Sequence, residues 1–510
     1  MASGSLYSLS SHKEKSKDTI PCRIEFIKDL LKDKKLESMV DFDKADTEYF
    51  VYNDDNASQN SKDTRIILKK RQYDFENIIK QIGGKLMYVK SGTTGHTFKG
   101  VACDEFGEFE YAVKVVAYQK KDKQGNMYSM MHDITRPENA ELLMIKTLSY
   151  FVVKKQTPHI VLPIGTFDTN IQIFIDLVSS NVVADNERYN EFVKKYKDGL
   201  YYDDVSILIS EWANRGDLLD FIRKYYRQFT ALHWKVIFFQ ILSVLAVIQS
   251  KYPSFRHNDL KANNILVHKI AKDKERFTYT VVKSTYKVPN IGYHIKLWDF
   301  DFACIPGVVD NRKVEAEWTK HIGVIPEQNR YYDVHYFFNT LIRKGFCPEV
   351  MTSDAVPQET KNFINRIIPK KYQKANTQYI HKRGRLLIND EYLTPDDILK
   401  HDEYFAEFRS GTSNNQSCKH FTNSKNVKKE NNISTDIKNI QNNIESTPKM
   451  LADITKFLKT KSSSSSEDIE ITKILKGGKK KSIKPKKNNK KKEKHRTISD
   501  NKNDPEFVLL

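Results

Sequence analysis

The sequence predicts an α+β protein in which a strand-rich region comes first and a mainly helical region follows. Between residues 85 and 118, short apolar stretches separated by a glycine-bearing turn are typical of two or three strands. After Trp212 the apolar residues adopt helical spacing, most clearly in the run ALHWKVIFFQILSVLAVIQS. The last hundred residues are rich in Asn, Lys and Ser and are too polar to form a packed core.

We therefore expect three parts along the chain. Residues 1–84 form a partly helical extension, residues 85–408 form a globular domain with lobes at 85–212 and 213–408, and residues 409–510 form a disordered basic tail. Within the domain, a helix that begins near Pro137 separates the first strands from two more, HIVLPIGTF and SILISEW, which flank a polar stretch at 180–203. An enlarged hairpin is expected at about 268–293, and helices from about 330 onward.

Composition and charge restrict the protein class and its partners. The five cysteines lie far apart without a C-x-x-C pair, which argues against a disulfide framework or a zinc site and suits a reducing compartment. The longest apolar run, Val236–Ile248, is too short to span a bilayer, so we expect a soluble protein with no transmembrane segment. Residues 411–510 hold 23 Lys and Arg against 11 Asp and Glu, so most of the net charge of +19 belongs to the tail.

A polar loop with the sequence FRHNDLKANNILV, at Phe255–Val267, follows the long apolar run. Phosphoryl transfer relies on positioning and charge neutralisation, for which a carboxylate orients the acceptor hydroxyl and an amide oxygen holds Mg²⁺. Asp259 and Asn264 can supply these groups, and Lys261 between them can steady the transferred phosphoryl group. A polar loop that only connects a helix to a strand is the alternative.

Two further pieces lie in the strand-rich region. Gly92 and Gly95 occupy a turn between two strands, where the absence of a Cβ lets backbone N–H groups approach phosphate oxygens. An ordinary hairpin turn would have the same composition. Lys114 lies in the apolar strand segment AVKV and needs a counter-charge, unless it faces solvent on an edge strand.

Two acidic residues complete the set. Glu141 lies at the margin of an apolar helix face and can pair with the strand lysine, with Glu138 one turn earlier as its rival. Asp299 ends the strand-like segment LWD and could complete the coordination of Mg²⁺ beside Asn264, because Mg²⁺ prefers hard oxygen ligands. All five of these segments occur in one chain in the order that a phosphoryl-transfer site requires, which favours such a site over five unrelated segments.

The patterns H-x-D-x-K-x-x-N, A-V-K-V and D-F-D, taken together, resemble the motifs of eukaryotic-type protein kinases over roughly residues 85–408. With YYDVHYFFN, IIPKKY and EY-x-TP-x-x-IL, the chain looks like the divergent serine/threonine kinases of large cytoplasmic DNA viruses, similar to the poxvirus virion kinase and its giant-virus relatives. The resemblance implies a bilobal protein-kinase fold and an ATP-dependent serine/threonine protein kinase.

The resemblance also implies a role for each site residue. Asp259 would be the catalytic base, with Lys261 stabilising the transferred phosphoryl group. Asn264 and Asp299 would bind Mg²⁺, with Mn²⁺ as a substitute. ATP would be anchored by Lys114 and Glu141 beneath the loop that contains Gly92 and Gly95, and backbone groups of Glu211 and Ala213 would face its adenine, with Ser210 in the gatekeeper position.

Three departures from the kinase pattern leave alternatives open. Lys90 replaces the first glycine of the loop, Asn258 replaces the usual arginine, and Asp301 replaces the glycine of D-F-G. A pseudokinase scaffold is therefore one alternative, and a small-molecule kinase of related fold is another. Because Asn258 removes the usual cation for a phosphorylated activation loop, we expect activity without phosphorylation of that loop.

The expected partners are protein substrates and, through the tail, an acidic surface. Residues 473–496 contain thirteen basic residues and one acidic residue, which indicates binding to nucleic acid, an acidic protein or anionic lipid, unless the segment is only solvated. Without aromatic residues between the lysines, nucleic acid would be bound without sequence preference. We expect a cytoplasmic protein, in the host cytoplasm or the virion if it is viral, with nuclear import through the tail as a rival.

Overall fold

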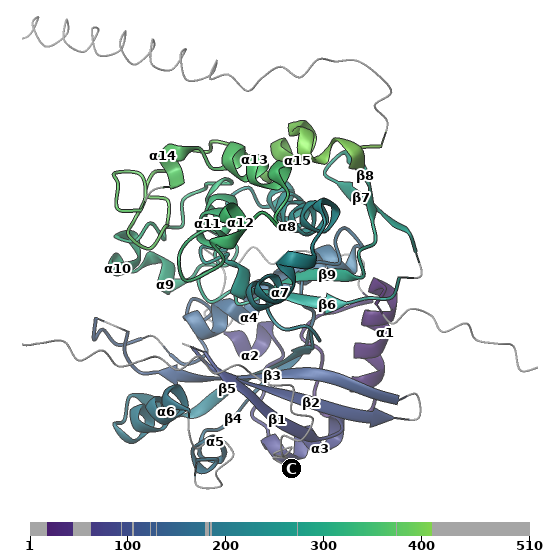
Figure 1. Ribbon diagram of the computed structural model, residues 1–510. Coiled ribbons are helices and arrows are strands. Elements are labelled where there is room, and N and C mark those ends of the chain that lie inside the picture. Colours follow the sequence, from purple (N-terminus) through teal and green to yellow (C-terminus); the bar gives the residue numbers. More distant parts are fainter. Residues whose placement is uncertain are drawn as a thin grey trace, which may run out of the picture. The chain divides into compact units, whose positions relative to one another are not determined.

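The computed structural model describes residues 18–43 and 63–410, except residues 93, 105, 106, 123, 129, 179–182, 184, 185, 273 and 374. Within these ranges a five-stranded sheet comes first in the chain and a mainly helical region follows, in agreement with the α+β class expected from the sequence (Figure 1). The predicted disordered tail lies, from residue 411 onward, outside the described residues.

The sheet is antiparallel throughout, in the order β1-β2-β3-β5-β4. Its register places Lys114 at the centre of β3, opposite Thr97 on one side and Leu208 on the other. The inner strand β5 is buried without interruption from Val205 to Glu211, as expected for a strand that is covered on both faces. The strands are β1 (Lys85–Ser91), β2 (His96–Asp104), β3 (Gly107–Gln119), β4 (Pro163–Asn170) and β5 (Tyr201–Glu211).

Helices cover both faces of the sheet. In Figure 1, α4 lies on the face toward the helical region, whereas α3, α5 and α6 lie on the opposite face. Pro137 begins α4 at a position where a missing N–H costs nothing, and the helix runs for seventeen residues without a break. The helices of this region are α1 (Ile20–Leu31), α2 (Thr64–Ile67), α3 (Phe75–Ile82), α4 (Pro137–Val153), α5 (Gln172–Asp176) and α6 (Glu187–Lys197).

The polar stretch at 180–203 contains a helix that its composition did not predict. Helix α6 is capped by Asn186, whose side chain accepts a hydrogen bond from the Tyr189 N–H at 3.1 Å. Tyr189 and Phe192 are buried against the sheet, while the charged residues face outward. The high polarity of the segment hid a short apolar face at helical spacing.

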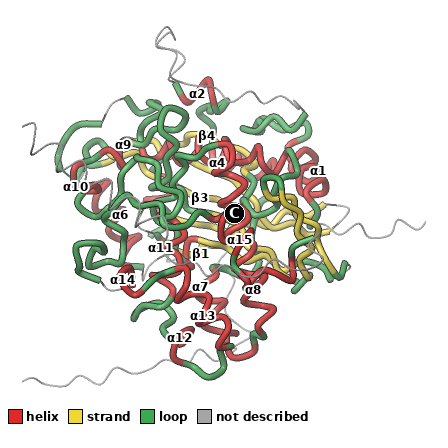
Figure 2. The backbone as a smooth tube through the Cα atoms, turned by 90° about the horizontal axis from the view of Figure 1, so that it is seen from above, coloured by secondary structure: helices red, strands yellow, loops and turns green. Residues whose placement is uncertain are grey.

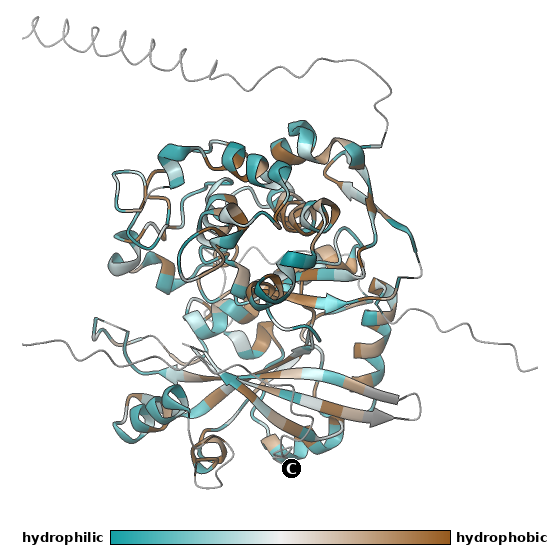
Figure 3. Ribbon diagram, viewed as in Figure 1, coloured by the Kyte–Doolittle hydropathy of each residue, from teal (hydrophilic) through white to brown (hydrophobic). Residues whose placement is uncertain are grey.

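The helical region is built around α8, which is almost entirely buried and largely brown in the hydropathy view of Figure 3. Among the described residues, α8 is the one helix long and apolar enough to cross a membrane, but 78% of its most apolar window is buried inside the structure, as in the core helix of a soluble protein. The elements here are α7 (Leu218–Tyr225), η2 (Tyr226–Gln228), α8 (Ala231–Lys251), η3 (Ala262–Asn264), α9 (Arg312–Glu315), α10 (Glu317–Lys320), α11 (Tyr332–Leu341), α12 (Glu349–Thr352), α13 (Gln358–Ile367), α14 (Lys370–Gln373), α15 (Pro395–His401) and η4 (Glu403–Phe408).

Two antiparallel ladders lie between α8 and α9 in the chain. The ladder of β6 (Ile265–Lys269) and β9 (Tyr293–Leu297) follows the polar loop directly. The hairpin of β7 (Arg276–Val281) and β8 (Ser284–Pro289) lies within the enlarged hairpin expected at 268–293. Seen from above in Figure 2, the labelled strands β1, β3 and β4 of the five-stranded sheet lie among helices and loops.

Candidate active site

Lys114 and Glu141 form a buried ion pair between β3 and α4. The Lys114 Nζ lies 2.5 Å from the Glu141 Oε1, and both side chains are less than a tenth exposed. The rival, Glu138, instead accepts a hydrogen bond from the Gln119 N–H at 3.3 Å. Asp299 approaches the same ammonium, with its Oδ1 3.6 Å from the Lys114 Nζ. Two carboxylates from distant parts of the chain thus lie beside the ammonium of Lys114.

The local charges keep this lysine protonated. Burial lowers the pKa of Lys114, but the carboxylates of Glu141 and Asp299 outweigh burial and hold the pKa above its ordinary value. Burial also raises the pKa of Glu141, an effect that the Lys114 charge opposes. The ammonium therefore remains a fixed positive charge that can bind a phosphate oxygen.

The glycine-bearing turn lies beside Val115 and Val116 of β3. The Gly92 N–H donates a hydrogen bond to the Gly95 carbonyl oxygen at 2.8 Å. A Cβ on Gly95 would come within 2.5 Å of the Val115 carbonyl oxygen, so only glycine fits this close approach. On the opposite face of the sheet, the His96 ring packs on Tyr189 of α6, with centroids 4.3 Å apart. Helix α6 therefore contacts His96, the residue that directly follows the turn.

Asp259 lies in the polar loop and carries a fully engaged carboxylate. Its Oδ2 accepts hydrogen bonds from the Lys261 Nζ at 2.8 Å and from the Asn264 Nδ2 at 3.0 Å. Its Oδ1 forms an ion pair with the Arg385 guanidinium. Burial raises the pKa of Asp259, but the charges of Arg385 and Lys261 outweigh burial and lower the pKa below its ordinary value. This carboxylate is therefore ionised at neutral pH.

Arg385 reaches the loop from the connection between α14 and α15. Besides its ion pair, its guanidinium donates a hydrogen bond to the Asn258 carbonyl oxygen and stacks on the Tyr336 ring, 4.3 Å from the ring centroid. Although Asn258 replaces an arginine of the kinase pattern, the structure supplies a different arginine to the same loop.

Asn264 and Asp299 lie at the same end of the β6–β9 ladder. Ile265 pairs with Leu297, Asn264 immediately precedes β6, and Asp299 lies two residues after Leu297. The Asn264 amide nitrogen donates to the Asp259 carboxylate, which leaves the amide oxygen for another partner. The Asp299 side chain is 36% exposed. An amide oxygen and an accessible carboxylate fit the hard oxygen ligands that Mg²⁺ prefers.

At the end of β5, Ser210, Glu211 and Ala213 are buried, whereas Trp212 is partly exposed. The Glu211 N–H already donates to the Leu162 carbonyl oxygen at 3.1 Å. The Glu211 carboxylate is held by Arg23 of α1, at 2.6 Å, and by the Lys296 ammonium of β9, at 3.2 Å. Burial raises the pKa of Glu211, but these two cations outweigh burial and lower the pKa well below its ordinary value. The Glu211 carbonyl oxygen accepts a long hydrogen bond from the Ser210 Oγ at 3.5 Å and has a second acceptor position that it can offer a ligand.

The polar loop is tied to the segment that follows Asp299. Asp333 of α11 accepts hydrogen bonds from the N–H groups of His257 and Asn258, at 2.7 and 2.9 Å. Arg256 donates to the carbonyl oxygens of Gly323 and Glu327, both at 3.1 Å. A buried arginine thus binds the far end of this segment through main-chain oxygens.

Comparison with known proteins decides the family. The family model described as poxvirus serine/threonine protein kinase matches residues 115–394, which is more than half of the chain. The chain belongs to this family. A protein of Acanthamoeba polyphaga mimivirus that is named as a serine/threonine-protein kinase is 44% identical over 394 residues, which cover 76% of this chain and 80% of the relative.

A second relative comes from a poxvirus. Serine/threonine-protein kinase 2 of fowlpox virus is 28% identical over 205 residues, which cover 39% of this chain and 43% of the relative. The family and the mimivirus relative show that this chain is a serine/threonine protein kinase, as the motifs predicted. The predicted resemblance to kinases of large DNA viruses is confirmed as well.

Sequence reasoning missed three cations that hold the site together. Arg385 contacts Asp259 across 126 residues of chain, and Arg23 contacts Glu211 across 188. Neither arginine lies in a motif. Lys296 could have been predicted to form a buried ion pair. It interrupts the apolar strand segment IKL, which directly precedes Trp298, and a lysine in such a strand requires a buried partner.

Proposed function

We propose that the sheet and the helical region are the two lobes of this kinase and that ATP binds between them. The kinase would transfer the γ-phosphoryl group to serine or threonine hydroxyls of proteins. The observation that carries the proposal is the convergence of Glu141 and Asp299 on the buried ammonium of Lys114. This cation would bind the α- and β-phosphates, and the turn at Gly92 and Gly95 would cover them.

Asp259 would accept the proton of the acceptor hydroxyl. Its lowered pKa keeps the carboxylate ionised. Because Oδ2 already accepts from Lys261 and Asn264, the acceptor hydroxyl would donate to Oδ1 or to the position on Oδ2 that Lys261 vacates. Lys261 would then release one of its donor hydrogens toward the transferred phosphoryl group. Arg385 would hold the carboxylate in place throughout.

Asn264 and Asp299 would hold Mg²⁺ through an amide oxygen and a carboxylate oxygen. When bound, the metal ion neutralises charge on the phosphates during transfer. The Glu211 carbonyl oxygen and the backbone of Ala213 would contact adenine. Because Arg23 of α1 forms an ion pair with the Glu211 carboxylate, the N-terminal extension would fix the position of this backbone contact with adenine.

We infer that the segment after Asp299 needs no phosphate to be ordered. Arg256 supports its end through the carbonyl oxygens of Gly323 and Glu327, and Asp301 near its start forms an ion pair with Lys313. These contacts supply the cross-links that a phosphorylated residue would otherwise make with an arginine.

The experiment compares ATP binding with phosphoryl transfer in Asp259→Asn, Asp299→Asn and the surface control Asp220→Asn. Asp259→Asn should bind Mg-ATP like the wild type but transfer at least about 100-fold more slowly, since general-base catalysis contributes about 10²–10⁴-fold. Asp299→Asn should need more Mg²⁺ for the same rate, and the control should match the wild type. Unchanged transfer in both site variants would contradict the assignment.

The pseudokinase alternative has one observation in its favour, because both oxygens of the Asp259 carboxylate are engaged by cations or an amide. It predicts that the wild type binds ATP without transfer.

From the viral relatives we propose a site of action in the host cytoplasm or the virion. The basic segment 473–496, which lies outside the described residues, would recruit acidic partners.

A further inference from the structure

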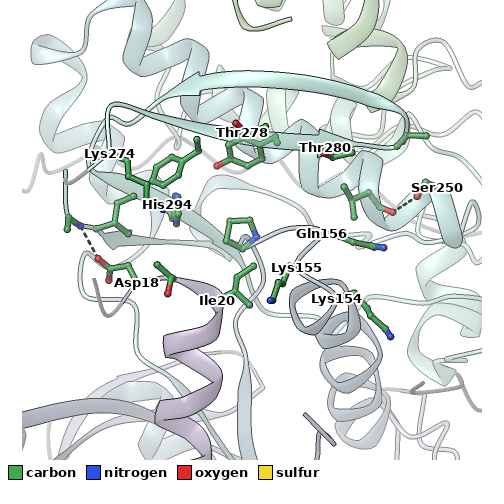
Figure 4. Close-up of a pocket in the computed structure, with 18 residues that line it drawn as sticks. Asp18, Ile20, Lys154, Lys155, Gln156, Ser250, Lys274, Thr278, Thr280 and His294 are labelled. Carbon is green, nitrogen blue, oxygen red and sulfur yellow. Dashed lines mark hydrogen bonds between the residues drawn. The ribbon is translucent and has the colours of Figure 1, made fainter. Parts of the chain in front are cut away.

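A cavity of about 560 Å³ lies between the start of α1, the end of α4, α8 and the β7–β8 hairpin (Figure 4). None of the proposed active-site residues lines it. Its volume is in the range of pockets that bind ligands. Apolar side chains of Ile20, Phe277 and Val282 contribute to its wall.

The cavity carries an excess of positive charge. Lys154 and Lys155 line it at the end of α4, and Lys274 lines it from the connection before β7 (Figure 4). Within the described part of the chain, none of these three lysines forms an ion pair. Among the described residues, Asp18 is the one acidic residue of the lining, and its carboxylate already accepts hydrogen bonds from His268 and the Ala271 N–H. An occupant should therefore be acidic as well as partly apolar.

Strand β7 presents an unpaired edge to this cavity. Facing pairs in an antiparallel hairpin alternate between hydrogen-bonded and non-hydrogen-bonded pairs. Pro289 has no N–H and faces Arg276, so that pair is not hydrogen-bonded, and by alternation neither are the pairs formed by Thr278 and Thr280. The main-chain groups of these two threonines point away from β8, and they have no hydrogen-bond partner among the described residues. Both residues line the cavity.

We propose that residues 505–510 of this chain, with the sequence PEFVLL, bind in this cavity as an added strand on β7. Addition of a strand would pair the free N–H and C=O groups of Thr278 and Thr280. Glu506, with Asp504 just before the segment, matches the lysines in charge, and Phe507 to Leu510 match the apolar wall. This inference concerns a second site and does not depend on the proposed catalytic roles.

The covalent connection is long enough for this docking. The Ser410 N–H donates to the Thr285 carbonyl oxygen on β8, so the described chain leaves from the other strand of the same hairpin. Residues 411–503 then connect it to the segment, and at a maximum reach of about 3.3–3.6 Å per residue their number does not restrict the docking. Tethering makes the association intramolecular and raises the effective concentration of the segment. The acidic stretch Glu467–Thr472 is a poorer occupant, because lysines follow it at 473 and 476.

The test is hydrogen–deuterium exchange of the full-length protein, followed on peptides that cover residues 276–282. In Phe507→Asp the amides of Thr278 and Thr280 should exchange about tenfold faster than in the wild type, because an open strand edge loses its protection. The matched control, Ile471→Asp, places the same charge in the other acidic stretch of the tail and should leave the exchange unchanged. Equal exchange in Phe507→Asp and wild type would overturn the proposal, as would faster exchange in the control.

Charge exchange provides an independent readout. The double variant Lys154→Glu/Lys155→Glu should expose the β7 amides as Phe507→Asp does, and adding Glu506→Lys should restore part of the protection. No restoration would refute the contact between these charges. Protection should also be independent of protein concentration. If it increases with concentration, the strand comes from a second copy and the intramolecular docking is wrong.

Discussion

Replacement of Arg23 by methionine should destabilise the protein strongly, although Arg23 lies far from the reacting groups. The guanidinium is 6% exposed and donates four hydrogen bonds, two to the Glu211 carboxylate at 2.6 and 2.7 Å and two to the carbonyl oxygens of Pro158 and Ile160 at 2.8 and 2.7 Å. Methionine keeps most of the side-chain volume and removes all four donors. Because a buried carboxylate loses its main counter-charge, the free energy of unfolding should fall by about 3–5 kcal/mol.

The effect should depend on pH in a defined direction. The folded pKa of Glu211 lies below its ordinary value of 4.5, so its contribution to stability is complete above that pH and is lost as the pH falls toward the folded pKa. Arg23→Met removes part of this contribution. The difference in stability between wild type and variant should therefore be largest near pH 7 and shrink below pH 4.5.

The assay is urea-induced unfolding of the full-length protein at several pH values. Arg71→Met is the matched control, because Arg71 makes an exposed ion pair with Glu37, and such pairs contribute about 0–1 kcal/mol. A loss in Arg23→Met no larger than that in Arg71→Met would refute the reasoning. So would a loss that stays constant from pH 7 down to about pH 3, well below the ordinary pKa of Glu211.

Three further predictions concern the active site. Arg385→Gln should raise the pKa of Asp259, so the acidic limb of the pH–rate profile should move to higher pH; an unshifted profile would show that Arg385 acts only through folding. Gly95→Ala should raise the KM for ATP, because its Cβ would meet the Val115 carbonyl oxygen at 2.5 Å, and steady-state kinetics that match the wild type would contradict this. Lys114→Met should weaken ATP binding in calorimetric titration by about 1.5–3 kcal/mol, the value of a hydrogen bond to a charged group, and unchanged affinity would remove Lys114 from the site.

The sequence was most informative where a site residue lies in a short local pattern. Lys114 in AVKV and the loop with Asp259, Lys261 and Asn264 could be found because each motif places its residues on one strand or one turn. Glu141 could be found only together with a rival, because helical periodicity limits the choice to one face without deciding between adjacent turns.

The long-range cations could not be predicted from the sequence. The contact from Arg385 to Asp259 depends on how the connection after α14 folds back over α11, and no local pattern encodes that path. Helix α6 was hidden by its charged residues, and the free edge of β7 became visible only once the pairing register with β8 was known. Tertiary packing, rather than local propensity, decides these features.

The central claim is that this kinase phosphorylates serine or threonine hydroxyls with Asp259 as the base. Its most direct test is phosphoamino-acid analysis of a protein substrate after incubation with labelled ATP, Mg²⁺ and either the wild type or Asp259→Asn. We expect labelled phosphoserine or phosphothreonine with the wild type and at least about 100-fold less with the variant. Labelled phosphotyrosine, or equal labelling by both proteins, would contradict the account.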